Sequence, residues 1–130
     1  MTSKHNKISN PLKHLLYNII LKENLNSLKS VKKLLKKFNN NVTLYKGLSN
    51  VILAKINMSE IDFVFLDGGH SYETVKNDLF LILKNIKKNK VIICDDYDQK
   101  DYGVKKAVDE LINNVTEIKE LNKRLVKITT

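Results

Sequence analysis

The sequence predicts an α/β fold with a mostly parallel sheet that ends in an antiparallel hairpin. Two observations lead to this prediction. Residues 61–66 and 91–94 are nearly continuous apolar runs, which are typical of strands covered on both faces. Between them, residues 71–86 carry apolar side chains at helical spacing. Such a strand, helix and strand form a crossover long enough for parallel pairing, and these crossovers are right-handed in nearly all proteins.

Four further elements are expected before this unit. Pro11, the only proline, can open a helix because its missing N–H costs little at the first turn. Asn26 and Ser27 are suitable caps for a second helix. The expected elements are helices over residues 12–21 and 28–38, a strand over 42–45 that ends at Gly47, and a short helix over 50–56.

The C-terminal part adds a helix and two strands. Gly103 precedes a helical pattern over residues 104–112. Two weakly alternating runs, at 116–121 and 124–129, surround Asn122 and Lys123 and predict a terminal antiparallel hairpin.

Length and composition describe an ordinary globular protein. The chain has 130 residues, about the size of one domain, and 42% of them are hydrophobic. No apolar run approaches the ~20 residues that a membrane span needs, and the first ten residues do not resemble a signal peptide. The sequence therefore predicts a single domain in the cytoplasm, without a membrane partner. Cys94, the only cysteine, is expected to be a buried thiol.

The net charge of +9 is concentrated near the N-terminus. Residues 1–50 hold ten lysines and one acid, whereas residues 51–130 hold thirteen basic and thirteen acidic side chains. We expect a basic helical segment over 1–40 and the α/β part over 41–130. Only one basic residue is an arginine, and nucleic-acid readers favour arginine forks and interleaved aromatics. The lysines are better explained as a solvated helix face, so nucleic acid is not the favoured partner.

Acidic side chains follow both strands of the predicted parallel pair. Asp67 comes directly after the first strand and is followed by Gly68, Gly69 and His70, while Asp95 and Asp96 follow the second strand. Ligands of open α/β sheets bind outside the carboxyl ends of the strands. Oxygen clusters of this kind suit Mg²⁺ or Ca²⁺, or can accept a proton from a substrate hydroxyl.

Each of these acids alone could equally cap a helix or solvate a loop. A lone histidine is also more often structural than catalytic. The combination favours a site: two consecutive apolar strands end in aspartate at the same edge, with glycine and histidine beside one of them.

Three segments resemble the class I S-adenosylmethionine-dependent methyltransferases of domain family 24. They are D-G-G-H-S-Y at residues 67–72, D-D-Y at 95–97 and G-V-K-K-A-V at 103–108. The resemblance implies a Rossmann-like methyltransferase fold. It also implies transfer of a methyl group from S-adenosylmethionine to an oxygen of a small-molecule acceptor.

The resemblance also implies roles for individual residues. His70 and Asp67 would be catalytic, with His70 as the candidate base. The cofactor would contact Gly47, Leu48, Ser49, Asp67 and Gly68. In metal-assisted relatives, acids at the positions of Asp67, Asp95 and Asp96 bind a divalent ion, which would be Mg²⁺ here.

Two family features are absent from the N-terminal part. The family's first strand ends in a glycine-rich loop that holds the cofactor, and its second strand ends in an acid that holds the ribose. Here the first glycine is Gly47, and the only earlier acid is Glu23. We therefore expect a truncated methyltransferase-like fold that is weakly active or inactive alone.

Two other functions remain open at this stage. The first is a non-catalytic subunit that binds a partner, or a second copy, through an exposed sheet edge at residues 61–66. The second is a nucleic-acid-binding module that uses the lysine-rich N-terminal helices.

Overall fold

The computed structural model describes residues 27–130. Contacts divide the chain into two units, with the boundary between Lys46 and Gly47, and each unit is described by itself. The helix predicted over 12–21, with its start at Pro11, and the cap proposed at Asn26 lie outside the described residues. The boundary expected after residue 40 and the single domain stay predictions.

The described part of the first unit is a short basic helix and an extended segment. Helix α2 (Leu28–Leu34) continues into the 3₁₀ turn η2 (Lys36–Phe38), which confirms the helix predicted over 28–38. The Ser27 side chain caps α2 by accepting a hydrogen bond from the Ser30 N–H at 3.1 Å.

The strand predicted over residues 42–45 is wrong. These residues are exposed and have no regular secondary structure. Alternating apolar side chains fit a strand, but a strand also needs a neighbour for its backbone groups. No strand pairing is found for this segment among the described residues.

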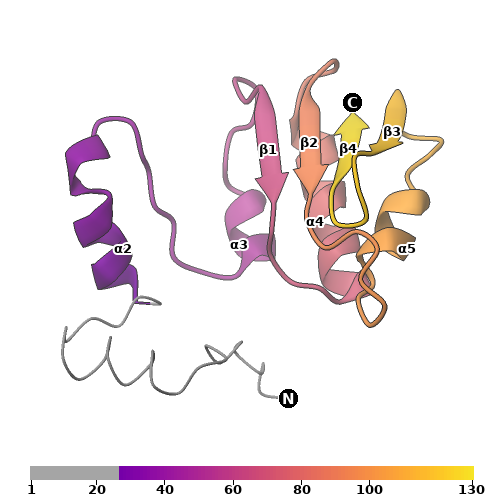
Figure 1. The fold of residues 1–130 in the computed structure, drawn as a ribbon. Helices are drawn as coiled ribbons and strands as arrows, with labels where there is room; N and C mark the ends of the chain where they lie inside the picture. The colour runs from indigo at the N-terminus through magenta and orange to yellow at the C-terminus, as the bar shows by residue number, and fades with distance from the viewer. Residues whose placement is uncertain (1–26) are drawn as a thin grey trace, which may run out of the picture. The chain divides into compact units, whose positions relative to one another are not determined.

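The second unit is built on a four-stranded sheet in the order β1-β2-β4-β3 (Figure 1). Its strands are β1 (Phe63–Leu66), β2 (Val91–Cys94), β3 (Glu117–Glu120) and β4 (Val126–Thr129). β1 and β2 are parallel neighbours, as predicted, and β3 and β4 form the predicted antiparallel hairpin.

The sheet is mixed rather than mostly parallel. The hairpin places its second strand, β4, antiparallel beside β2, so two of the three pairings are antiparallel. The described chain supplies one parallel pair. β1 is thus an edge strand among the described strands, in agreement with the exposed edge expected at residues 61–66.

Three helices accompany the sheet: α3 (Ser49–Leu53), α4 (Tyr72–Asn85) and α5 (Val104–Asp109). α4 begins after Ser71, whose side chain accepts a hydrogen bond from the Thr74 N–H at 3.3 Å. Its apolar stripe, with Leu79 and Ile82 at most 1% exposed, faces the sheet. α4 therefore forms the crossover that makes β1 and β2 parallel (Figure 1).

The core lies between one face of the sheet and these helices. Alternate residues of β2 and β4 point into it: Ile92, Cys94, Val126 and Ile128. Burial raises the pKa of the Cys94 thiol to about 12, so this cysteine is the inert buried thiol that was predicted. On the opposite face of β1, Phe63 and Phe65 are about half exposed.

Within residues 27–130, none of the helices has both the length and the apolar character that crossing a membrane would require.

Candidate active site

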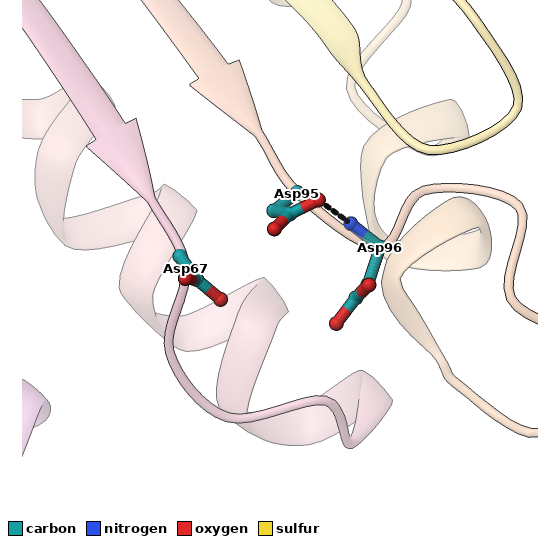
Figure 2. A group of neighbouring side chains, drawn as sticks. All are labelled: Asp67, Asp95 and Asp96. Carbon is teal, nitrogen blue, oxygen red and sulfur yellow. Dashed lines mark hydrogen bonds between the residues drawn. The ribbon is translucent and has the colours of Figure 1, made fainter.

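The carboxyl ends of β1 and β2 bring three aspartates together (Figure 2). The parallel register pairs Leu66 with Cys94, so Asp67 and Asp95 follow side by side, and the Asp95 N–H donates to the Leu66 carbonyl at 3.0 Å. Each of Asp67, Asp95 and Asp96 offers a carboxylate oxygen, and these oxygens lie within 4.8 Å of one another. We call these three residues the acid cluster. Their convergence is what the sequence predicted.

Asp96 turns the chain sharply out of the sheet. Its φ of 56° lies in the left-handed region, which aspartate tolerates better than most residues. Its N–H donates to Asp95 Oδ1 at 2.8 Å (Figure 2). After this turn the Asp96 carboxylate lies beside His70.

His70 lies between Asp96 and an aromatic ring. Its Nδ1 is 3.3 Å from Asp96 Oδ2, and its ring stacks on Tyr102 with centroids 4.2 Å apart and planes 9° from parallel. A carboxylate beside Nδ1 favours a proton on that nitrogen, which leaves Nε2 to accept one from a substrate. The imidazole is about one third exposed, so a ligand at the sheet edge can reach it.

Arg124 is a member of the site that sequence reasoning missed. From the turn between β3 and β4, its Nε and Nη2 donate to the two carboxylate oxygens of Asp95 at 2.5 and 2.6 Å. The same Nε is 3.6 Å from Asp96 Oδ1. These hydrogen bonds hold the pKa of Asp95 below its ordinary value. The one feature of the sequence that could have pointed to Arg124 is that it is the chain's only arginine and lies at the turn of a predicted hairpin.

The glycines after Asp67 serve different purposes. A Cβ on Gly68 would meet nothing within 4 Å, so the backbone there is open to a ligand. A Cβ on Gly69 would lie 2.6 Å from Thr74 Cγ2, so Gly69 lets the loop pack against α4. The cavity at this loop measures about 10 Å³, roughly the minimum for one water, so it has no room for a substrate.

The three other cofactor candidates lie at the start of α3. Gly47 and Leu48 are exposed and precede the helix, and Leu48 stands at its cap position. The Ser49 side chain hydrogen-bonds to Asp78 of α4, a buried residue, and not to the acid cluster. The roles of Gly47, Leu48 and Ser49 as cofactor contacts stay predictions.

The acid cluster has the oxygen ligands that a divalent ion prefers, but some of these oxygens are already hydrogen-bonded to Arg124. Carboxylate oxygens are the donors that Mg²⁺ prefers. Both oxygens of Asp95, however, already accept hydrogen bonds from Arg124. The Mg²⁺ expected from the resemblance therefore has no support in this arrangement.

The fold and the site together define a Rossmann-like α/β protein with three aspartates and a histidine at the carboxyl edge of its parallel strands, the edge where ligands of such sheets bind. The chain belongs to the methyltransferase domain family, whose model matches residues 9–97. This is the class I, S-adenosylmethionine-dependent family that the sequence motifs resemble. The match includes the segment before Gly47, where the glycine-rich loop was not found.

Solved structures support the fold. One is the crystal structure of a protein from Clostridium thermocellum assigned as an rRNA methylase, with a TM-score of 0.57 and 20% sequence identity. The similarity covers 78% of this chain and 68% of that one. No curated protein matches the chain.

Proposed function

We propose that this chain transfers a methyl group from S-adenosylmethionine to an oxygen of a small-molecule acceptor, with His70 as the general base. The observation that carries the proposal is the position of His70. Its Nδ1 faces Asp96 while its ring is held by Tyr102, and it follows Asp67 by three residues at the carboxyl edge of the sheet.

When bound, the cofactor supplies an electrophilic methyl group on a sulfonium sulfur. Transfer of that group to the acceptor oxygen would break the carbon–sulfur bond, with the sulfur keeping the electron pair. His70 Nε2 takes the acceptor's hydroxyl proton, and Asp96 stabilises the resulting imidazolium through Nδ1. Alignment of the two reactants supplies much of the remaining acceleration.

Asp67 and the open backbone at Gly68 would receive the methionine end of the cofactor. Gly47, Leu48 and Ser49 are proposed for its adenine side. Without a glycine-rich loop and a ribose carboxylate, we expect weak binding. Two hydrogen bonds to charged groups, lost at about 1.5–3 kcal/mol each, raise a dissociation constant by roughly two to four orders of magnitude.

Transfer of radiolabelled methyl groups from S-adenosylmethionine to a panel of phenols and catechols tests the reaction with the full chain. We expect slow transfer that His70→Ala reduces at least about a hundredfold, the usual size of a general-base contribution. His5→Ala is the matched control and should retain activity. Transfer that is unchanged in His70→Ala would refute the proposed base.

Cofactor binding is tested separately by isothermal titration with S-adenosylmethionine. Asp67→Asn should weaken the binding further. Micromolar affinity in the unmodified chain would contradict the weak binding expected without the glycine-rich loop and the ribose carboxylate.

RNA is a second candidate acceptor. The Clostridium thermocellum protein that shares this fold is assigned as an rRNA methylase, which does not fit the expectation that nucleic acid is an unlikely partner. Residues 27–46 also hold six lysines and no acid. The same methyl-transfer assay with total RNA as the acceptor distinguishes the two candidates. If the chain contacts RNA phosphates, its affinity for RNA should fall steeply as the salt concentration rises.

A further inference from the structure

Arg124 is fixed over the acid cluster by its backbone as well as its side chain. The Tyr97 N–H, just after the cluster, donates to the Arg124 carbonyl at 2.9 Å, and the Asp98 N–H donates to the Lys123 carbonyl at 3.2 Å. The Arg124 N–H itself donates to Asn122 Oδ1 at 2.8 Å. The turn of the hairpin is thus joined to the segment that carries Asp95 and Asp96.

The guanidinium uses the oxygens that a metal ion would need. Asp95 Oδ1 and Oδ2 each accept from Arg124, and Oδ1 also accepts from the Asp96 N–H. The Asp95 side chain is only 8% exposed, so it has little room to swing toward a second cation. A divalent ion would have to displace a two-point hydrogen-bonded ion pair.

The charges of the cluster lead to the same conclusion. Three carboxylates with oxygens within 4.8 Å repel one another, and a positive charge among them relieves that repulsion. Arginine supplies a permanent charge, because its guanidinium does not lose its proton in proteins. Arg124 donates a hydrogen bond to Asp95, and its Nε also lies 3.6 Å from Asp96 Oδ1.

We propose that Arg124 is the resident cation of the acid cluster, occupying the place in which Asp67, Asp95 and Asp96 would otherwise bind a divalent metal ion. The unmodified protein then has only weak affinity for a divalent ion at this edge. Removal of the guanidinium converts the cluster into a three-carboxylate metal site. This inference concerns cation binding and does not depend on methyl transfer.

Titration of the full chain with Mn²⁺, with the free ion followed by electron paramagnetic resonance, tests the proposal. Mn²⁺ has the same preference for oxygen ligands as Mg²⁺. The unmodified protein should bind Mn²⁺ no more tightly than about 1 mM. Arg124→Gln should bind one ion roughly a hundredfold more tightly, because two charge-assisted hydrogen bonds no longer oppose the ion.

Two variants locate the effect. Lys123→Gln removes a neighbouring charge from the same turn and should behave like the unmodified protein. Asp95→Asn combined with Arg124→Gln should lose the gained site.

The proposal is overturned if the unmodified protein binds Mn²⁺ below the millimolar range and Asp67→Asn or Asp95→Asn abolishes that binding. It is also overturned if Arg124→Gln melts like the unmodified protein and still gains no site. Should Arg124→Gln fail to fold, Arg124→Lys replaces it. That variant keeps a charge without the two-point geometry and should show a smaller gain in affinity, whereas no gain in the folded variant counts against the proposal.

Discussion

The ring of His70 lies flat against the ring of Tyr102, 4.2 Å from centroid to centroid. The next residue, Gly103, donates its N–H to the His70 carbonyl at 2.8 Å, so backbone and side chain both tie the two loops together. The loop before α5 thereby sets the orientation of the proposed base.

Replacement of Tyr102 should impair methyl transfer without abolishing the fold. Tyr102→Phe keeps the stacking surface and should transfer at nearly the unmodified rate. Tyr102→Ala frees the imidazole and should lower the rate about tenfold, because a misdirected base removes the proton less efficiently. Initial rates at saturating acceptor, with the melting temperature as a control, distinguish the two. Equal rates in both variants would show that the stack has no positioning role.

Gly103 is the glycine of the site loops whose added side chain would clash with backbone. A Cβ there would lie 2.2 Å from the Tyr72 nitrogen, a backbone atom that cannot move aside cheaply. Gly103→Ala should lower the free energy of unfolding by about 1–3 kcal/mol, the usual cost of forced overpacking. Gly68→Ala, where a Cβ meets nothing within 4 Å, is the matched control. Urea denaturation measures both, and similar losses would contradict the predicted close approach.

Acid should weaken the fold partly through Asp95. Its pKa in the folded chain is lowered, chiefly by the hydrogen bonds from Arg124, from an ordinary value of 3.8. Stability from this carboxylate is therefore fully present above that value and is lost as the pH falls below it.

Asp95→Asn removes this contribution. Between pH 5 and about 2, its free energy of unfolding should fall less steeply than that of the unmodified chain. Urea denaturation at a series of pH values measures the slopes. Glu120→Gln, which removes an exposed carboxylate of β3 outside the site, is the control. Identical slopes in Asp95→Asn and the unmodified chain would disprove the coupling.

Asp78 should destabilise the fold at neutral pH. It is 2% exposed, its Oδ1 has no hydrogen-bond partner within the described part of the chain, and burial raises its pKa. Because the folded pKa lies above the unfolded one, the penalty is absent at low pH and grows as the pH rises through the folded value.

Asp78→Asn removes the charge and keeps an acceptor for Ser49. At pH 7 it should be more stable than the unmodified chain by about 1–2 kcal/mol, within the range for a buried unsatisfied group. The difference should shrink toward pH 4. Chemical denaturation at both pH values tests this, and a variant that is less stable at pH 7 would show that the charged form is satisfied.

Self-association should use the edge of β1. Among the described strands this one has a single neighbour, and its Phe63 and Phe65 side chains are 56% and 52% exposed. Exposed apolar edges favour pairing with another strand, and lysine opposes it. Sedimentation velocity should show a dimer that Phe65→Lys dissociates, with Phe80→Lys, an exposed change on α4, as the control. A monomer at all concentrations would end this expectation.

Local sequence patterns predicted the parts of the fold that they encode. The apolar runs around Val64 and Ile92, with Ser71 as the cap of the intervening helix, were sufficient to predict a parallel pair and the convergence of its terminal aspartates. These signals are short-range. The pattern of residues 42–45 was misleading because alternation describes a strand's faces and says nothing of whether a neighbouring strand exists.

The contacts that complete the site are long-range and left little trace in the sequence. Arg124 meets Asp95 across 29 residues, and this contact depends on the hairpin turn reaching the end of β2. Nothing in the sequence distinguishes Tyr102 from other aromatic residues in loops. Its contact with His70 depends on the hydrogen bond between Gly103 and the His70 carbonyl, which only the structure shows. The hairpin itself was predicted, but its insertion of β4 beside β2 was not, since either strand of a hairpin can pair with a sheet.

The place of β4 has a consequence for how the protein is made. β2 leaves the ribosome well before β4, yet the two pair from Val91 with Thr129 through Cys94 with Val126. Until then the nascent chain holds a half-built sheet with an open strand on each side. Non-local pairing of this kind slows folding and prolongs exposure to aggregation. The arginine that meets the acid cluster arrives only with this hairpin, so the cluster stays without that partner until the last part of the sheet has formed.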